Sequence, residues 1–178
     1  MQCFIEPNLQ IQSLRQEDAL EIFYSIDNQR EYFSEFLPSV AKIVAVLETE
    51  MYVQSVLKDT KEGKSCVFVI RKNEHFAGLL SIRKTEKAAV EMGYWLRADF
   101  QGQGIAFKAV KYLCYYAFEE LKIQEIRIKC VPENTMSKQI PIHLGFQLEG
   151  VESVRDEDIK NKFPIMEVYL LSKQVKVF

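Results

Sequence analysis

One stretch near the middle of the chain changes abruptly from strand-like to helix-like periodicity, and glycines mark the change. Residues Ala89–Leu96 form an apolar run typical of a strand. Gly102 and Gly104 lie in the short loop that follows, and apolar residues then recur at helical spacing over residues 105–121. The order of strand, glycine loop and helix makes this the most informative segment of the sequence.

The glycine loop has the properties of a phosphate site. Glycine lets the backbone approach a ligand without a Cβ atom in the way, and the first N–H groups of a helix attract anions. A dinucleotide-binding loop would need a third glycine, but this chain has Phe107 at that position. It would also need an acidic residue after the next strand, but Glu125 lies before that strand. The loop is not a nucleotide-binding P-loop either, because no Gly-Lys-Ser or Gly-Lys-Thr follows its glycines. The plainer alternative is a glycine turn that only starts a helix.

Composition indicates a globular chain. The 178 residues are 48% hydrophobic with a net charge of −2, which excludes disorder as the main property. We expect one domain over residues 1–178. No basic stripe suggests nucleic acid, no apolar run approaches the roughly 18 residues of a membrane helix, and no signal peptide is recognised, which favours a cytoplasmic location. The four cysteines form no CxxC pair, so we expect no metal site.

The remaining pattern is read as β αα βββ α β α ββ, which predicts an α+β domain with a central mixed sheet. The first strand is expected at residues 9–14. Residues 32–38 are expected to interrupt the first helical region, because the residue before Pro38 disfavours helix, and Ser39 is expected to cap a second helix. Further strands are expected at 66–71, 76–83, 126–131, 146–154 and 163–171, and a further helix at 134–144.

The loop also matches a family signature. Gln101-x-x-Gly104-x-Ala106 resembles the pyrophosphate-binding signature of the GNAT N-acetyltransferases. With the segments 91–96, 129–137 and 144–150, in the same order, the chain resembles the RimJ/RimL branch, which acetylates the N-termini of ribosomal proteins. The resemblance covers essentially the whole chain. It implies the GNAT fold, a mixed, mostly antiparallel sheet of about seven strands with helices on both faces and a splayed pair of parallel strands.

The resemblance implies that acetyl-CoA is the co-substrate and lies between the splayed strands 91–97 and 126–131. The backbone of Trp95, Leu96 and Arg97 would pair with the pantetheine arm, and Asn134 would bind the arm from the other side. The pyrophosphate would be held by the backbone amides of Gln101, Gly102, Gln103, Gly104, Ile105 and Ala106.

The implied chemistry is direct attack of a primary amine on the thioester. Many GNAT enzymes carry an acid tyrosine four residues before the Gly-Phe pair, where this chain has Pro141. The RimL-like pattern instead matches Ser137, as acid or thiol partner, although a serine in the first helical turn can equally bond the local backbone. For the base, Glu91 comes first and Asp156 or Glu157 second; a solvated carboxylate is the alternative for each.

The acceptor stays open at this stage. Tyr32, Phe33 and Phe36 would line its groove, and we expect at least one of them to pack in the core instead. An α-amine, with a pKa of about 7.7–8.0, needs less help to lose its proton than a lysine at about 10.4, which favours a protein N-terminus. A small-molecule amine such as an aminoglycoside or polyamine, and a non-catalytic CoA-binding module, are the alternatives. Monomer and homodimer are both compatible with the sequence.

Overall fold

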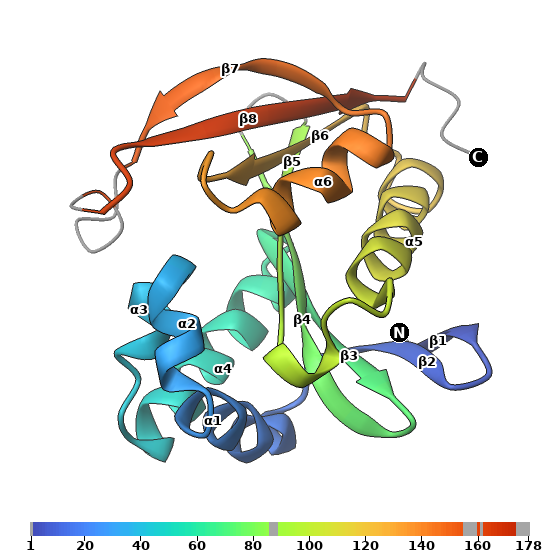
Figure 1. The fold of residues 1–178 in the computed structure, drawn as a ribbon. Helices are drawn as coiled ribbons and strands as arrows, with labels where there is room; N and C mark the ends of the chain where they lie inside the picture. Colours follow the sequence, from blue (N-terminus) through green and yellow to red (C-terminus); the bar gives the residue numbers. More distant parts are fainter. Residues whose placement is uncertain (1, 86–88, 155–159, 161, 174–178) are drawn as a thin grey trace.

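The computed structural model describes residues 2–85, 89–154, 160 and 162–173, which build one mixed sheet of eight strands (Figure 1). The strand order is β1-β2-β3-β4-β5-β6-β8-β7. Every neighbouring pair is antiparallel except β5 and β6. The strands are β1 (Gln2–Glu6), β2 (Leu9–Ser13), β3 (Ser65–Lys72), β4 (His75–Lys84), β5 (Ala89–Leu96), β6 (Glu125–Cys130), β7 (Gln147–Ser153) and β8 (Ile165–Ser172).

Helices cover both faces of the sheet, as expected for the GNAT fold (Figure 1). Because side chains alternate along a strand, β3 sends Val67 and Val69 into one core and Phe68 and Ile70 into the other. The first core packs beneath α1 (Ala19–Asp27), α2 (Arg30–Phe36), α3 (Pro38–Ala41) and α4 (Val46–Lys61). The second packs beneath α5 (Ile105–Glu119) and extends toward α6 (Thr135–His143), and short 3₁₀ turns at Gln16–Asp18 and Ala98–Phe100 complete the described elements.

The structure corrects three expectations about the N-terminal third. An additional strand, β1, pairs with β2, so the sheet has eight strands rather than about seven. Residues 30–36 are helical, because Pro38 occupies the first turn of a separate helix, α3, where its missing N–H costs nothing. Ser39 therefore lies within α3 instead of capping the second helix.

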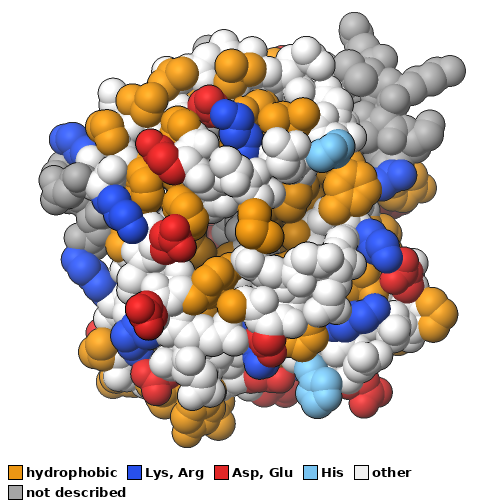
Figure 2. Space-filling model, viewed as in Figure 1, with side chains coloured by type: hydrophobic (Ala, Val, Ile, Leu, Met, Phe, Trp, Pro, Cys, Tyr) orange, Lys and Arg blue, Asp and Glu red, His pale blue; other side chains and the backbone are white. Residues whose placement is uncertain are grey.

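Charged side chains of both signs are interspersed over the face shown in Figure 2, and neither sign gathers into a patch of its own. Among the described residues, every helix is too short or too polar to cross a membrane.

Candidate active site

The only parallel pair of the sheet separates partway along its length. Strands β5 and β6 pair from Ala89 opposite Glu125 as far as Met92 opposite Ile128. Beyond that point β5 continues to Leu96 and β6 to Cys130 without pairing to each other. The two strands thus diverge toward their carboxyl ends, which is the splayed pair that the sequence predicted. We call the space between the diverging ends the split.

The glycine loop leads from the end of β5 into the uncapped N-terminus of α5. Gly102 and Gly104 have φ angles of +70° and +71°, which explains why glycine stands at both positions. The first helical bond runs from the Lys108 N–H to the Gly104 carbonyl at 3.1 Å, so the amides of Ile105 and Ala106 precede it. No side chain of the described residues caps this end. Amides without a helical partner at the positive end of a 15-residue helix can bind an anion.

The backbone of β5 presents only part of the surface expected for the pantetheine arm. The Arg97 N–H donates to the Ala77 carbonyl at 2.9 Å, and the Arg97 carbonyl accepts from the Phe100 N–H at 3.1 Å. Both backbone groups of Arg97 thus have partners within the chain, contrary to the pairing expected for this residue. Since backbone groups alternate in direction along an antiparallel strand, those of Trp95 also face β4, and those of Leu96 face the split.

Two side chains connect the first helices to the glycine loop. The Tyr32 hydroxyl, on α2, donates to the Leu96 carbonyl at 3.2 Å and accepts from the Gln101 amide. The Gln29 side chain donates to the Asp99 carboxylate at 2.9 Å and accepts from the Ala98 N–H at 2.8 Å. Burial raises the pKa of Tyr32, so this hydroxyl stays protonated. Tyr32 and Gln101 therefore meet where the glycine loop begins.

The other two aromatic residues expected in the acceptor groove have different surroundings. Phe33 is only 1% exposed and packs edge-on against Trp95, so it belongs to the core, as the sequence indicated for at least one of the three. Phe36 is partly buried and stacks on Phe163, with 5.5 Å between ring centroids. The Lys162 ammonium also donates to the Glu35 carbonyl at 3.0 Å. The end of α2 thus contacts the segment that leads into β8.

Ser137 lies on α6, beside the split. The Asn134 side chain caps α6 by accepting from the Ser137 N–H at 3.0 Å. The Ser137 hydroxyl donates to the Tyr94 hydroxyl at 3.1 Å and lies 3.5 Å from the Cys130 sulfur. Burial raises the pKa of Tyr94 and that of Cys130, so both groups stay protonated near neutral pH. Residues from β5, β6 and α6 therefore meet at one point across the split.

Glu91 lies on the opposite face of β5, among charged neighbours. Its carboxylate accepts from Arg83 at 2.8 Å and from Lys129 at 2.9 Å, and Lys129 also pairs with Glu152 at 2.8 Å. Burial would raise the pKa of Glu91, but the two cations outweigh burial and hold that pKa below its usual value. A carboxylate held ionised by two partners is a weak proton acceptor, so the geometry favours a structural role over that of a base.

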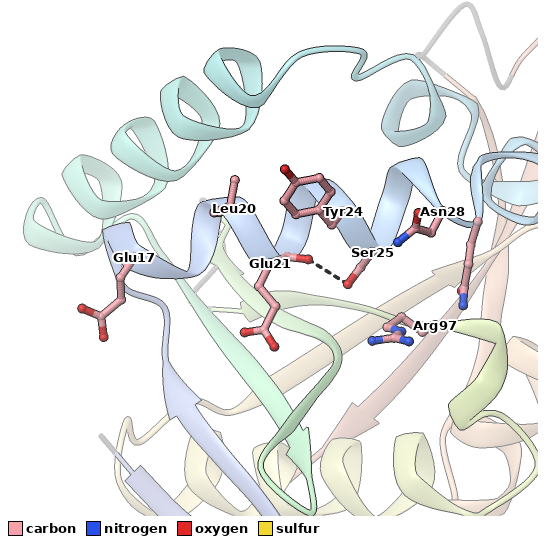
Figure 3. Close-up of a pocket in the computed structure, with 8 residues that line it drawn as sticks. Glu17, Leu20, Glu21, Tyr24, Ser25, Asn28 and Arg97 are labelled. Atoms are coloured by element: carbon pink, nitrogen blue, oxygen red, sulfur yellow. Dashed lines mark hydrogen bonds between the residues drawn. The ribbon is translucent and has the colours of Figure 1, made fainter.

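A hollow of about 390 Å³ opens on the outer side of α1 (Figure 3). Of the residues expected at the cofactor site, only Arg97 lines it, and the Arg97 side chain is paired with Asp99 at 2.7 Å. Glu21, another lining residue, is bonded to Arg71 at 2.8 Å. The hollow is lined by Glu17, Leu20, Glu21, Tyr24, Ser25, Asn28, Gln29 and Arg97.

The remaining expectations concern the second candidate base and a metal site. Asp156 and Glu157 lie outside the described residues. Within the described part of the chain, no cluster of three or more His, Cys, Asp or Glu side chains could hold a metal ion. Sequence reasoning missed Tyr94 and Gln29. Their signals in the sequence are weak, because Tyr94 is one residue of a segment typical of the family and Gln29 stands between two helices.

The split and the glycine-initiated N-terminus of α5 are features that the family resemblance implies, and comparison with known families identifies the class. Residues 8–147 match the family described as acetyltransferase (GNAT) domain. The chain belongs to the GNAT acetyltransferase family. It is therefore an acetyltransferase whose acetyl donor is acetyl-CoA.

Two curated relatives are informative. The ribosomal-protein-serine acetyltransferase of Escherichia coli (strain K12) is 24% identical over 148 residues, which cover 82% of this chain and 83% of that protein. A putative ribosomal N-acetyltransferase of Bacillus subtilis (strain 168), YdaF, is 35% identical over 75 residues, or 41% of each chain.

Solved structures share the fold. RimL, a ribosomal L7/L12 α-N-protein acetyltransferase in complex with coenzyme A, superposes with a TM-score of 0.89 at 21% identity, covering 97% of this chain and 98% of that one. The microcin C7 self-immunity acetyltransferase MccE, in complex with acetyl-CoA and AMP, gives a TM-score of 0.86 at 22% identity over 94% of both chains. The same fold thus occurs in a ribosomal-protein acetyltransferase and in a microcin C7 self-immunity acetyltransferase.

Proposed function

We propose that the protein transfers the acetyl group of acetyl-CoA to the N-terminal α-amine of a protein. The observation that carries the proposal is the placement of Ser137 at a split that opens toward the glycine-initiated N-terminus of α5. The similarity to ribosomal-protein acetyltransferases in both sequence and fold supports a protein acceptor. A small-molecule amine is the alternative, because the fold is not confined to acetyltransferases of ribosomal proteins: MccE, named for microcin C7 self-immunity, shares it to a similar extent.

In this proposal the two sides of the split hold the cofactor. The amides of residues 101–106 bind the pyrophosphate, and the backbone of Leu96 pairs with the pantetheine arm. The Asn134 Oδ1 atom is used in capping α6, so the Asn134 Nδ2 group is the one that donates to the arm from the opposite side. This arrangement directs the thioester toward Ser137 and the point where β5 and β6 separate.

The reaction is a direct transfer within the ternary complex. The neutral amine attacks the thioester carbonyl carbon, the C–S bond breaks, and coenzyme A leaves as a thiolate that takes up a proton. Ser137 hydrogen-bonds the departing sulfur. An α-amine with a pKa of about 7.7–8.0 is partly neutral at physiological pH, so the ammonium proton can pass to water or to a carboxylate. Asp156 is the candidate carboxylate, in place of the ion-paired Glu91.

Tyr32 and Phe36 border the acceptor side in this proposal. Tyr32 reaches the Leu96 carbonyl, and Phe36 stacks on Phe163. Both side chains extend from α2, so one short helix would contact the incoming amine and, through Gln101, the cofactor loop. Phe33 has no place in this contact because it is buried in the core.

The test begins with calorimetric titration of acetyl-CoA, with NAD as the control ligand. Release of coenzyme A thiol is then measured with peptides that begin with Ser or Ala, the same peptides blocked at the N-terminus, and polyamines and aminoglycosides. Turnover of only the unblocked peptides supports the proposal. Turnover of only the small amines would replace it with the alternative, and acetyl-CoA binding without any turnover would indicate a non-catalytic module.

A further inference from the structure

Helix α6 contains a proline that leaves one backbone carbonyl without its helical partner. Pro141 is buried inside α6. In an α-helix the N–H of residue 141 would bond to the carbonyl of residue 137, but proline has no N–H. The Ser137 carbonyl is therefore available to a donor from outside the helix.

The Tyr94 hydroxyl, from β5, is that donor. It donates to the Ser137 carbonyl at 2.8 Å, and it accepts from the Ser137 hydroxyl at 3.1 Å. One phenol thus bonds both the backbone and the side chain of Ser137. These two bonds join α6 to β5 across the split, on the side where the cofactor sulfur is expected.

The directions of these bonds follow from the number of protons. The single Tyr94 proton is used on the Ser137 carbonyl, so the contact between the two hydroxyls uses the Ser137 proton. The lone pairs of the Ser137 hydroxyl then face Cys130, whose sulfur lies 3.5 Å away. Burial raises the pKa of Tyr94, which keeps the phenol protonated and bonded to the Ser137 carbonyl. When coenzyme A leaves as a thiolate, the Ser137 hydroxyl turns its single proton from Tyr94 to the sulfur, while the bond from Tyr94 to the Ser137 carbonyl holds the residue in place.

We propose that Tyr94 is a positioning residue that holds Ser137 at the split, through the carbonyl that Pro141 leaves without a helical partner. The inference rests on the proposed function of Ser137 as partner of the coenzyme A sulfur and adds what places it there. Tyr94 acts through Ser137 rather than on the reacting atoms, so its effect on turnover requires the Ser137 hydroxyl.

A double-mutant cycle tests the dependence on Ser137. Tyr94→Phe removes both bonds and keeps the ring. We expect kcat to fall about tenfold, with the Kd for acetyl-CoA changing less than about twofold. In the Ser137→Ala background the same change should have no further effect on kcat. Tyr116→Phe, on α5, is the matched control for loss of a phenol hydroxyl and should leave kcat unchanged. Independent, multiplicative effects of Tyr94→Phe and Ser137→Ala would overturn the proposal.

Pro141→Ala provides a second test, in which stability and kcat should change in opposite directions. The substitution restores an N–H that competes with Tyr94 for the Ser137 carbonyl. We expect a higher melting temperature, because the helix gains a bond, together with a lower kcat. A general destabilising effect would lower both quantities. Unchanged kcat at a raised melting temperature would contradict the role of the Ser137 carbonyl.

Crystal structures with coenzyme A separate this inference from the proposed function. In the unmodified protein Ser137 should occupy one rotamer, and in Tyr94→Phe it should move or occupy more than one. A single, unchanged Ser137 rotamer in the variant would refute the positioning role even if acetyl transfer is fully confirmed. A displaced Ser137 would support it even if no tested acceptor is acetylated.

Discussion

Substitution of Gly104 by alanine separates the structural role of the glycine loop from its role in binding the cofactor. Gly104 has a φ of +71°, and a Cβ atom built there meets nothing within 4 Å. The folded state therefore loses only the strain of a left-handed alanine, about 1–2 kcal/mol. For a chain of this size that corresponds to a fall in melting temperature of roughly 2–8 °C.

Gly145 offers a matched control. It has a φ of +83° at the end of α6, and a Cβ atom there also meets nothing within 4 Å. Gly145→Ala should therefore cost the same 1–2 kcal/mol, about as much as Gly104→Ala. The two variants differ in one respect, which is that only Gly104 precedes the amides proposed to bind the pyrophosphate.

The expected effect on cofactor affinity is larger than the effect on stability. A hydrogen bond to a charged group contributes about 1.5–3 kcal/mol, so a methyl group that displaces one amide–phosphate bond should weaken acetyl-CoA binding by about 10- to 100-fold. Acetyl-pantetheine, which has the arm and the thioester but no pyrophosphate, should bind both variants as it binds the unmodified protein.

Calorimetric titration of the three proteins with both ligands measures these effects. Gly104→Ala should lose affinity for acetyl-CoA only, and Gly145→Ala should lose none. Unchanged acetyl-CoA affinity in Gly104→Ala would refute the placement of the pyrophosphate at this loop. Equal losses in both variants would show that backbone strain, and not contact with the phosphates, governs binding.

Three further predictions follow from the ion pairs and the core. A general base raises the reaction rate by about 10²–10⁴-fold. If Glu91 is structural, Glu91→Gln should lower kcat by less than about threefold in steady-state assays. A loss of kcat of about 100-fold would instead identify Glu91 as the base. Folding lowers the pKa of Glu91, so the ionised Glu91 carboxylate stabilises the folded protein. This stabilisation is fully present at pH values above the usual glutamate pKa of about 4.3, and it is lost as the pH falls through the lowered pKa. The difference in free energy of unfolding between Glu91→Gln and the unmodified protein, from urea titrations, should therefore shrink with acid; a difference independent of pH would contradict the ion pairs. The buried Thr49 hydroxyl has no hydrogen-bond partner among the described residues, so Thr49→Val should raise the melting temperature by about 2–4 °C, and a lower one in calorimetry would show an undetected partner.

Local features of the chain made part of the fold predictable. The bounds of β5 match the prediction because an apolar run is followed by a loop and a clear change of period. The same holds for the start of α5, where positive φ angles demand glycine. β1 was missed because its side chains are exposed or only partly buried, so it lacks the alternation that marks a half-buried strand. α2 is not predicted because a proline usually marks the end of a helix, whereas Pro38 begins the next one.

Side-chain roles were less predictable because they depend on register between distant segments. From the sequence alone, Glu91 could act as a general base. Its actual partners, Arg83 and Lys129, come from two other strands, and only the pairing of β4, β5 and β6 brings the three together. A carboxylate's pKa follows from such neighbours, so the choice between base and ion pair required the sheet.

The same reasoning links two sequence features that had separate explanations. In the sequence, Pro141 is a departure from the tyrosine that the family resemblance implies, and Tyr94 is one residue of a strand segment. In the structure the proline leaves the Ser137 carbonyl without its helical partner, and the Tyr94 hydroxyl bonds to that carbonyl. A phenol hydroxyl is thus present beside Ser137, contributed by β5 instead of α6. The departure from the family pattern at residue 141 therefore leaves the Ser137 carbonyl to a tyrosine from another element.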